Sequence, residues 1–183
     1  MNVRQTTKTI CYLSLGIALY VVFSLCFQVP IFDNYYICLG YIVMGVYCYS
    51  FGPIYGATVG TLGCILYCLL LNGLRGMPGW AFGNLYIGLV LGTLFQQTKK
   101  YNSLKADIVE ICIVISTCAI AMLFIKSNVE SILYSQPMII RMTKNVYAFI
   151  SDAFVLVLGL PIYSIMDRII KINFQYNGGT KDE

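Results

Sequence analysis

The sequence contains no histidine and very little charge. Of its 183 residues only 11% are charged, whereas soluble domains average about 25%. Without histidine the common zinc-ligand patterns fail, and no glycine-rich phosphate loop of the Walker type is present. We therefore predict that the chain is not an enzyme and that it needs neither a metal nor a cofactor.

Acidic residues are equally sparse. No two carboxylates stand at helical spacing deep inside an apolar run. Asp107 and Glu110 are three residues apart, but at the start of a predicted helix, where a helix N-terminus favours acids. The formal net charge of +4 comes without a clustered basic face, so we expect no nucleic-acid partner.

Long apolar runs fill most of the chain, which is 58% hydrophobic. This composition and length predict an all-α membrane protein, a compact bundle of six transmembrane helices in one integral membrane domain over residues 1–183. The first run is followed by Pro30 and not by a small-residue cleavage site, so we expect it to be retained as a helix. The expected helices cover about 9–29, 37–49, 54–71, 78–97, 106–125 and 145–166, and a polar tail covers 173–183.

The stretch from Phe51 to Phe95 organises the chain, because small residues recur in it at a spacing of four. This spacing allows two helix backbones to approach closely. The eight cysteines all lie in or beside apolar runs, where we expect them to act as small apolar fillers. The glycine sets are Gly52/Gly56/Gly60, Gly79/Gly83 and Gly88/Gly92.

Basic residues predict the orientation in the membrane. With six spans both termini lie on one side, and that side would hold eight of the twelve lysines and arginines. Cytoplasmic sides carry the excess of basic residues, so we expect both termini in the cytoplasm. The remaining four basic residues, on the outer side, are Arg75, Lys126, Arg141 and Lys144.

Polar and aromatic side chains gather toward the predicted outer end. Trp80 and Asn84 are one turn apart in the fourth helix, and an amide inside hydrocarbon should face the bundle interior. Asn145 and Asp152 share one face of the last helix. We predict a substrate site, open to the outside, that comprises Tyr35, Tyr36, Asn72, Arg75, Trp80, Asn84, Asn145, Phe149 and Asp152.

Each of these side chains also has a plainer interpretation. Trp80 and the tyrosines suit interface anchors, and Asn84 suits structural glue between helices. Asp152 could be satisfied by a neighbouring helix, and Arg75 could be a solvated charge. The sequence alone leaves these alternatives open.

Two segments carry a resemblance to a known family. FGPIYGATVGTLG follows the second helix, and GMPGWAFGNLYIGLVLGTLF forms the fourth. Together with the small size and six helices, they resemble the substrate-binding (S) components of energy-coupling factor (ECF) vitamin transporters. The resemblance implies high-affinity capture of a vitamin or related micronutrient at the outer face of a prokaryotic cell membrane, as the substrate-specific subunit of an ATP-driven importer.

The resemblance also implies partners. S components assemble in the lipid bilayer with one transmembrane coupling subunit and two ATPase subunits. Many carry an Ala-x-x-x-Ala motif on the first helix for docking to the coupling subunit. The nearest match here is Ser14 and Ala18, which we therefore expect to form the docking face. An acid that many members carry after the glycines of the third helix is replaced here by Cys64.

The residues leave the substrate open. The outer cations favour an acid such as pantothenate or a folate, whereas the 14% of aromatic residues suits a flavin, a pyrimidine or a modified nucleobase equally well. Two other classes stay open as well. One is a self-contained secondary transporter, which would show internal repeats and ionisable groups at midplane. The other is a membrane scaffold without a solute pocket.

Overall fold

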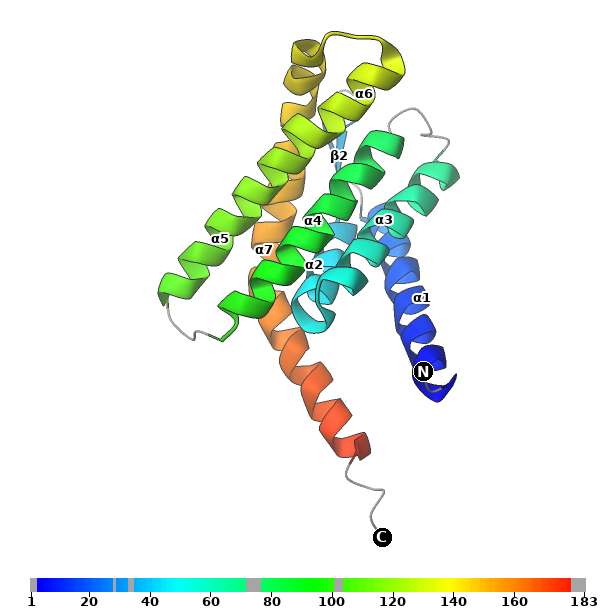
Figure 1. Cartoon of the computed structure of the whole chain (residues 1–183), viewed down its shortest axis with the longest axis vertical. Coiled ribbons are helices and arrows are strands. Elements are labelled where there is room, and N and C mark those ends of the chain that lie inside the picture. The colour runs from blue at the N-terminus through cyan, green and yellow to red at the C-terminus, as the bar shows by residue number, and fades with distance from the viewer. Residues whose placement is uncertain (1–2, 28, 33–34, 72–76, 101–103, 179–183) are drawn as a thin grey trace.

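The computed structural model describes residues 3–27, 29–32, 35–71, 77–100 and 104–178, with side chains for 7–27, 37–71, 77–100 and 106–172. Helices dominate it, and a small β-hairpin joins the first two (Figure 1). The elements in chain order are α1 (Val3–Cys26), β1 (Val29–Phe32), β2 (Tyr35–Ile37), α2 (Gly40–Phe51), α3 (Pro53–Leu70), α4 (Met77–Thr98), α5 (Leu104–Ala119), η1 (Ile120–Lys126), α6 (Ser127–Tyr134) and α7 (Met138–Gly178).

Five helical segments of the described chain are long and apolar enough to cross a membrane. The short α2 joins them to complete a six-helix bundle, which confirms the predicted fold class. The candidate spans are Thr7–Cys26, Pro53–Leu70, Met77–Thr98, Ala106–Tyr134 and Met138–Ile172.

The twelve-residue α2 is the central helix of the bundle. It packs against α1, α3, α4 and α7, and eight of its residues are buried. At 1.5 Å per residue it is only about 18 Å long, shorter than the ~30 Å hydrocarbon layer. Because its neighbours surround it, α2 does not need to span the layer by itself.

Helices α3 and α4 pack with their backbones nearly touching. A Cβ atom on Gly88 would clash with the backbone of Ala57, and one on Gly92 would clash with the backbone of Pro53. Gly52, between α2 and α3, has a φ of 92°, a conformation that favours glycine. The small-residue spacing in the sequence therefore corresponds to a real close crossing of two helices.

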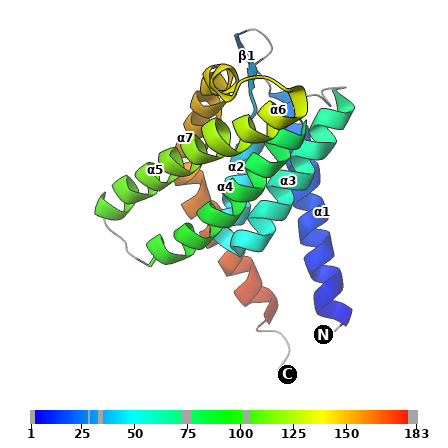
Figure 2. The same cartoon turned by 45° about the horizontal axis from the view of Figure 1, so that its top comes forward.

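The second half of the chain differs from the expected helix bounds. Residues 126–144 were expected to form a mixed loop with room for a short helix at 129–134. Instead α5 continues through a π-helical turn, η1, into α6, and only 135–137 separate α6 from α7. The last helix begins at Met138 and not at about Asn145. Three of its polar residues, Lys126, Ser127 and Glu130, are buried against other polar groups, which lets this segment stay helical. Figure 2 shows α5 and α6 as one continuous rod.

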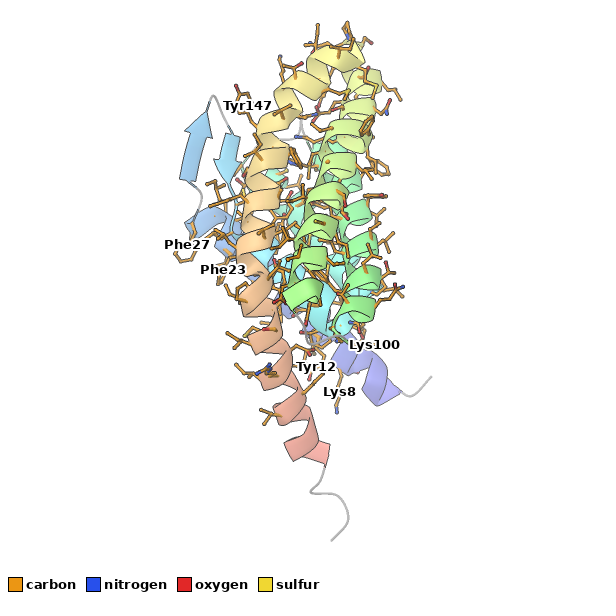
Figure 3. The ribbon with its side chains drawn as sticks, turned by 90° about the vertical axis from the view of Figure 1, so that its left-hand side faces the viewer. Lys8, Tyr12, Phe23, Phe27, Lys100 and Tyr147 are labelled. Carbon is orange, nitrogen blue, oxygen red and sulfur yellow. The ribbon has the colours of Figure 1, made fainter. Side chains whose placement is uncertain are left out.

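The segment after α1, expected to be a loop, contains an antiparallel hairpin in which Val29 pairs with Ile37 and Pro30 with Tyr36. Its β-branched and aromatic residues favour strands. The hairpin stands beside α7, which β2 contacts (Figure 3). The start of α1 and the end of α7 lie at the opposite end of the bundle (Figure 1).

The close crossing of α3 and α4 predicts different costs for two neighbouring glycines. Gly88→Ala should lower the free energy of unfolding by about 1–3 kcal/mol, because the added methyl forces two backbones apart. Gly83→Ala is the matched control, since its Cβ would meet nothing nearer than 3.6 Å and alanine is the better helix former. Thermal unfolding in detergent measures both, and equal melting temperatures would contradict the close crossing.

Candidate functional site

Buried and half-buried polar side chains from α4, η1, α6 and α7 meet at the end of the bundle away from the termini, and we call them the interior polar cluster. Glu130 lies at its centre with 5% of its surface exposed. Its carboxylate lies 3.8 Å from the Lys126 ammonium and 3.8 Å from the Arg141 guanidinium. The cluster consists of Trp80, Lys126, Ser127, Glu130, Arg141, Asn145 and Asp152.

Asn145 ties α7 to this carboxylate. Its Nδ2 donates to Glu130 Oε2 at 3.1 Å and to Ser127 Oγ at 3.0 Å. The Ser127 hydroxyl in turn donates to the Met122 carbonyl at 3.2 Å, which satisfies a backbone group within the π-helical turn. The wide turn of η1 thus sets the register in which Ser127 and Glu130 both reach Asn145.

The Lys126 ammonium lies over the ring of Trp80, 4.2 Å from its centroid. Only 3% of the Lys126 surface is exposed, so this cation–π contact is largely desolvated and correspondingly strong. Asp152, on α7, also interacts electrostatically with Lys126. The lysine therefore links Trp80, Glu130 and Asp152 into one electrostatic unit.

Three buried polar atoms of the cluster have no hydrogen-bond partner in the described part of the chain. They are Trp80 Nε1, Arg141 Nε and Asp152 Oδ2. A buried polar atom without a partner costs about 1–3 kcal/mol, so unpaired atoms gathered in one place call for an explanation. The two nitrogen atoms are free to donate a hydrogen bond and the oxygen atom is free to accept one, so the cluster is complementary to a polar ligand.

Asn84 lies deeper, and its amide is occupied within the protein. Its Nδ2 donates to Tyr20 Oη at 3.3 Å and to the Gly60 carbonyl at 3.2 Å, and its Oδ1 accepts from Tyr41 Oη at 2.9 Å. These bonds join α4 to α1, α2 and α3. Asn84 thus has the contacts of interhelical glue, one of the two interpretations that its sequence position allowed.

The structure brings together three of the predicted site residues, Trp80, Asn145 and Asp152. Phe149, on the same helix, is half-buried against the hydrophobic core. Tyr35 and Tyr36 fall in β2, but their side chains lie outside the described residues, as do Asn72 and Arg75 entirely. Ser14 and Ala18, predicted for docking, are both exposed on α1.

Sequence reasoning missed Lys126, Ser127, Glu130 and Arg141 as site residues because all four lie between the expected fifth and sixth helices. One signal could have found two of them. Lys126 and Glu130 are four residues apart with opposite charge, the spacing of a helical ion pair. Their burial depends on α7, which no local pattern reveals.

A cavity of about 510 Å³ lies away from this cluster, between α1, α2 and α7. Its lining is almost entirely apolar, whereas recognition of a small polar molecule needs placed hydrogen-bonding groups. We therefore place the candidate substrate site at the interior polar cluster and not in the apolar cavity.

The fold recurs among known membrane proteins. The crystal structure of the S-component for biotin from an ECF-type ABC transporter is similar, with a TM-score of 0.58 and 21% sequence identity over 93% of this chain and 95% of that chain. At this identity the likeness shows the fold, which is that of an ECF S component.

The family follows from the sequence match. The model of the family described as ECF-type riboflavin transporter, S component, matches residues 4–168, and the chain belongs to this family. It is therefore the substrate-specific, membrane-embedded subunit of an ECF importer, a transport subunit and not an enzyme. Membership of this family decides against the two other classes that the sequence left open, a self-contained secondary transporter and a scaffold without a pocket.

The contacts of Glu130 predict a strong stability effect. Glu130→Gln should cost about 3–5 kcal/mol, because it leaves two cations without their buried counter-charge. Lys126→Met in the same chain should recover part of that loss, since it removes one of these cations. A double-mutant cycle of unfolding in detergent measures the coupling, with the exposed Asp107→Asn as control. Additive effects would contradict the pairing.

Proposed function

We propose that this chain captures riboflavin, or a close flavin analogue, at the interior polar cluster. The observation that carries the proposal is the set of unpartnered polar atoms in the cluster, Trp80 Nε1, Arg141 Nε and Asp152 Oδ2. Two donors and one acceptor complement the imide edge of a flavin, in which two carbonyls flank an N–H. The name of the family is a second, independent support.

The charge balance of the cluster favours an uncharged ligand. Lys126 and Arg141 contribute two positive charges, and Glu130 and Asp152 contribute two negative ones, all in a largely buried setting. A neutral flavin preserves this balance. An anionic vitamin such as pantothenate or a folate would add a buried charge without a counter-charge, which is costly.

The proposal gives the site residues distinct roles. Trp80 offers an aromatic face next to Lys126, and Asp152 and Asn145 fix the polar edge of the ligand from α7. Phe149 extends the apolar wall on the same helix. Asn84, with both of its N–H groups engaged, positions α4 for the site. Tyr35, Tyr36, Asn72 and Arg75 complete the predicted set near the outer end.

The finer composition of the importer is part of the same proposal. We infer one transmembrane coupling subunit and two ATPase subunits, with ATP hydrolysis driving release of the vitamin inside the cell. We also infer a prokaryotic cell membrane with both termini in the cytoplasm. The contacts of Lys126 and Arg141 support this orientation. Both are among the four basic residues on the side opposite the termini, and both are paired with Glu130 in the site. Their presence on the outer side is therefore explained by the site.

Trp80 is the sole tryptophan, so its fluorescence reports directly on the site. We expect riboflavin to quench this emission at one ligand per chain, and biotin and pantothenate to leave it unchanged. Asp152→Asn should weaken riboflavin binding roughly ten- to hundredfold, the effect of losing a hydrogen bond to a charged group. Asp107→Asn, at an exposed position far from the cluster, should bind like the wild type.

Two results would contradict the proposal. One is a carboxylate vitamin as the molecule released from the denatured protein, identified by mass spectrometry. The other is equal riboflavin affinity of the Asp152 and Asp107 variants, which would place the ligand elsewhere.

The exposed small-residue face of α1 predicts a separable defect. Ala18→Phe should block assembly with the coupling subunit while riboflavin binding stays unchanged, because a bulky side chain prevents close helix packing. Ile108→Phe on α5 is the control, since Ile108 is also exposed. Co-purification of the subunits measures assembly, and normal assembly of Ala18→Phe would remove this face from the interface.

A further inference from the structure

Tyr41 lies between the candidate substrate site and the first helix. It belongs to α2, and only 3% of its surface is exposed. Its hydroxyl donates to Asn84 Oδ1 at 2.9 Å, and the same hydroxyl hydrogen-bonds with the side chain of Asp152. Since Asn84 is on α4 and Asp152 is on α7, a single hydroxyl group joins three helices.

The orientation of the Asn84 amide is fixed by its other bonds. Its Nδ2 donates to the Gly60 carbonyl at 3.2 Å, and a backbone carbonyl can only accept. The Nδ2 side of the amide must therefore face Gly60, which leaves Oδ1 to face Tyr41. Nδ2 also donates to Tyr20 Oη at 3.3 Å, and this extends the chain of hydrogen bonds to α1. The rings of Tyr20 and Tyr41 contact each other edge to face, 6.0 Å between centroids, which keeps both hydroxyl groups at the one amide.

Tyr41 has one hydroxyl hydrogen and two acceptors for it. An amide oxygen and an ionised carboxylate accept hydrogen bonds and cannot donate them. When the hydrogen points to Asn84, Asp152 lacks that donor, and its Oδ2 has no other partner in the described part of the chain. When the hydrogen points to Asp152, Asn84 Oδ1 is left unpaired. Each arrangement leaves a buried acceptor without a donor, which costs free energy, so the protein by itself cannot satisfy both.

A ligand that donates a hydrogen bond to Asp152 resolves this competition. Its N–H supplies the donor that the carboxylate lacks. It also disperses the negative charge, so that the carboxylate attracts the Tyr41 hydrogen less strongly. The hydrogen then stays on Asn84 Oδ1, and the amide holds Tyr20 with all of its bonds made. The occupancy of the site is in this way transmitted to α1.

We propose that Tyr41 is a switch that couples the candidate substrate site to α1. A donor bound at Asp152 shifts the Tyr41 hydrogen to Asn84, and this tightens the attachment of Tyr20 and of the helix that carries it. The inference rests on the proposed function, because it takes the imide N–H of a flavin as the donor. Tyr41 acts on the ligand through Asp152 and is a positioning residue. Since coupling between two sites is reciprocal, a displacement of α1 that breaks the bond between Tyr20 and Asn84 loosens the hold on the ligand.

The test is hydrogen–deuterium exchange of the full chain in detergent, read by mass spectrometry in the α1 segment around Tyr20. Saturating riboflavin, verified by quenching of Trp80, should slow exchange of these amides about two- to tenfold, the effect of one hydrogen bond. Tyr41→Phe should abolish this protection, because it removes the hydrogen that moves. Tyr47→Phe is the matched control and should keep it. Tyr47 is also on α2, and its hydroxyl also bonds α1, donating to the Tyr12 carbonyl at 2.8 Å.

A second comparison needs no ligand. Asp152→Asn replaces the charged acceptor by a weaker, neutral one, so the Tyr41 hydrogen should stay on Asn84. Exchange in α1 should then be about two- to tenfold slower than in the wild type, again the effect of one hydrogen bond. Combining Asp152→Asn with Tyr41→Phe should remove this difference.

Two results with riboflavin would overturn the proposal. One is unchanged exchange in α1 while Trp80 is fully quenched, and the other is protection of α1 that persists in Tyr41→Phe. If riboflavin does not quench Trp80, the proposed function fails, and the ligand-free comparison still decides about the switch. In that comparison, equal exchange in α1 of Asp152→Asn and the wild type would reject it.

Discussion

The end of the bundle away from the termini depends on one carboxylate, that of Glu130. A charge inside a membrane protein must be paired, and Glu130 pairs with Lys126 and Arg141 while it accepts from Asn145. The Lys126 ammonium, paired with this carboxylate, lies over the ring of Trp80. A single side chain on α6 therefore fixes the relation of α4, η1 and α7.

The structure separates two kinds of buried polar group that look alike in the sequence. Asn84 uses its amide on three neighbouring helices, so it holds the bundle together. Trp80 and Asp152 each keep one buried atom without a partner, and this is the condition under which a ligand gains most from a hydrogen bond. Position along a helix could not distinguish these cases, because the difference lies in what the other helices supply.

The fold was largely predictable because its main signals are local. Apolar runs of membrane-spanning length located the helices, and the spacing of Gly88 and Gly92 indicated a close helix contact, whose partner the structure identifies as α3. The continuation of α5 into α6 was not predicted, and this error has a physical cause. A helix that buries charges against other charges has the composition of a loop, and only its tertiary partners, here Asn145 and Trp80, show the difference.

Helix α1 is the least buried of the candidate spans, and this leaves most of its surface available to other molecules. Only 22% of its apolar window is buried, against 33–44% in the other candidate spans. A helix held on one face keeps its remaining faces for molecules outside the chain, and a subunit that works with membrane-embedded partners needs such a helix. Because Asn84 fastens Tyr20 of α1 to α4, α1 stays attached to the bundle while its outer faces remain available.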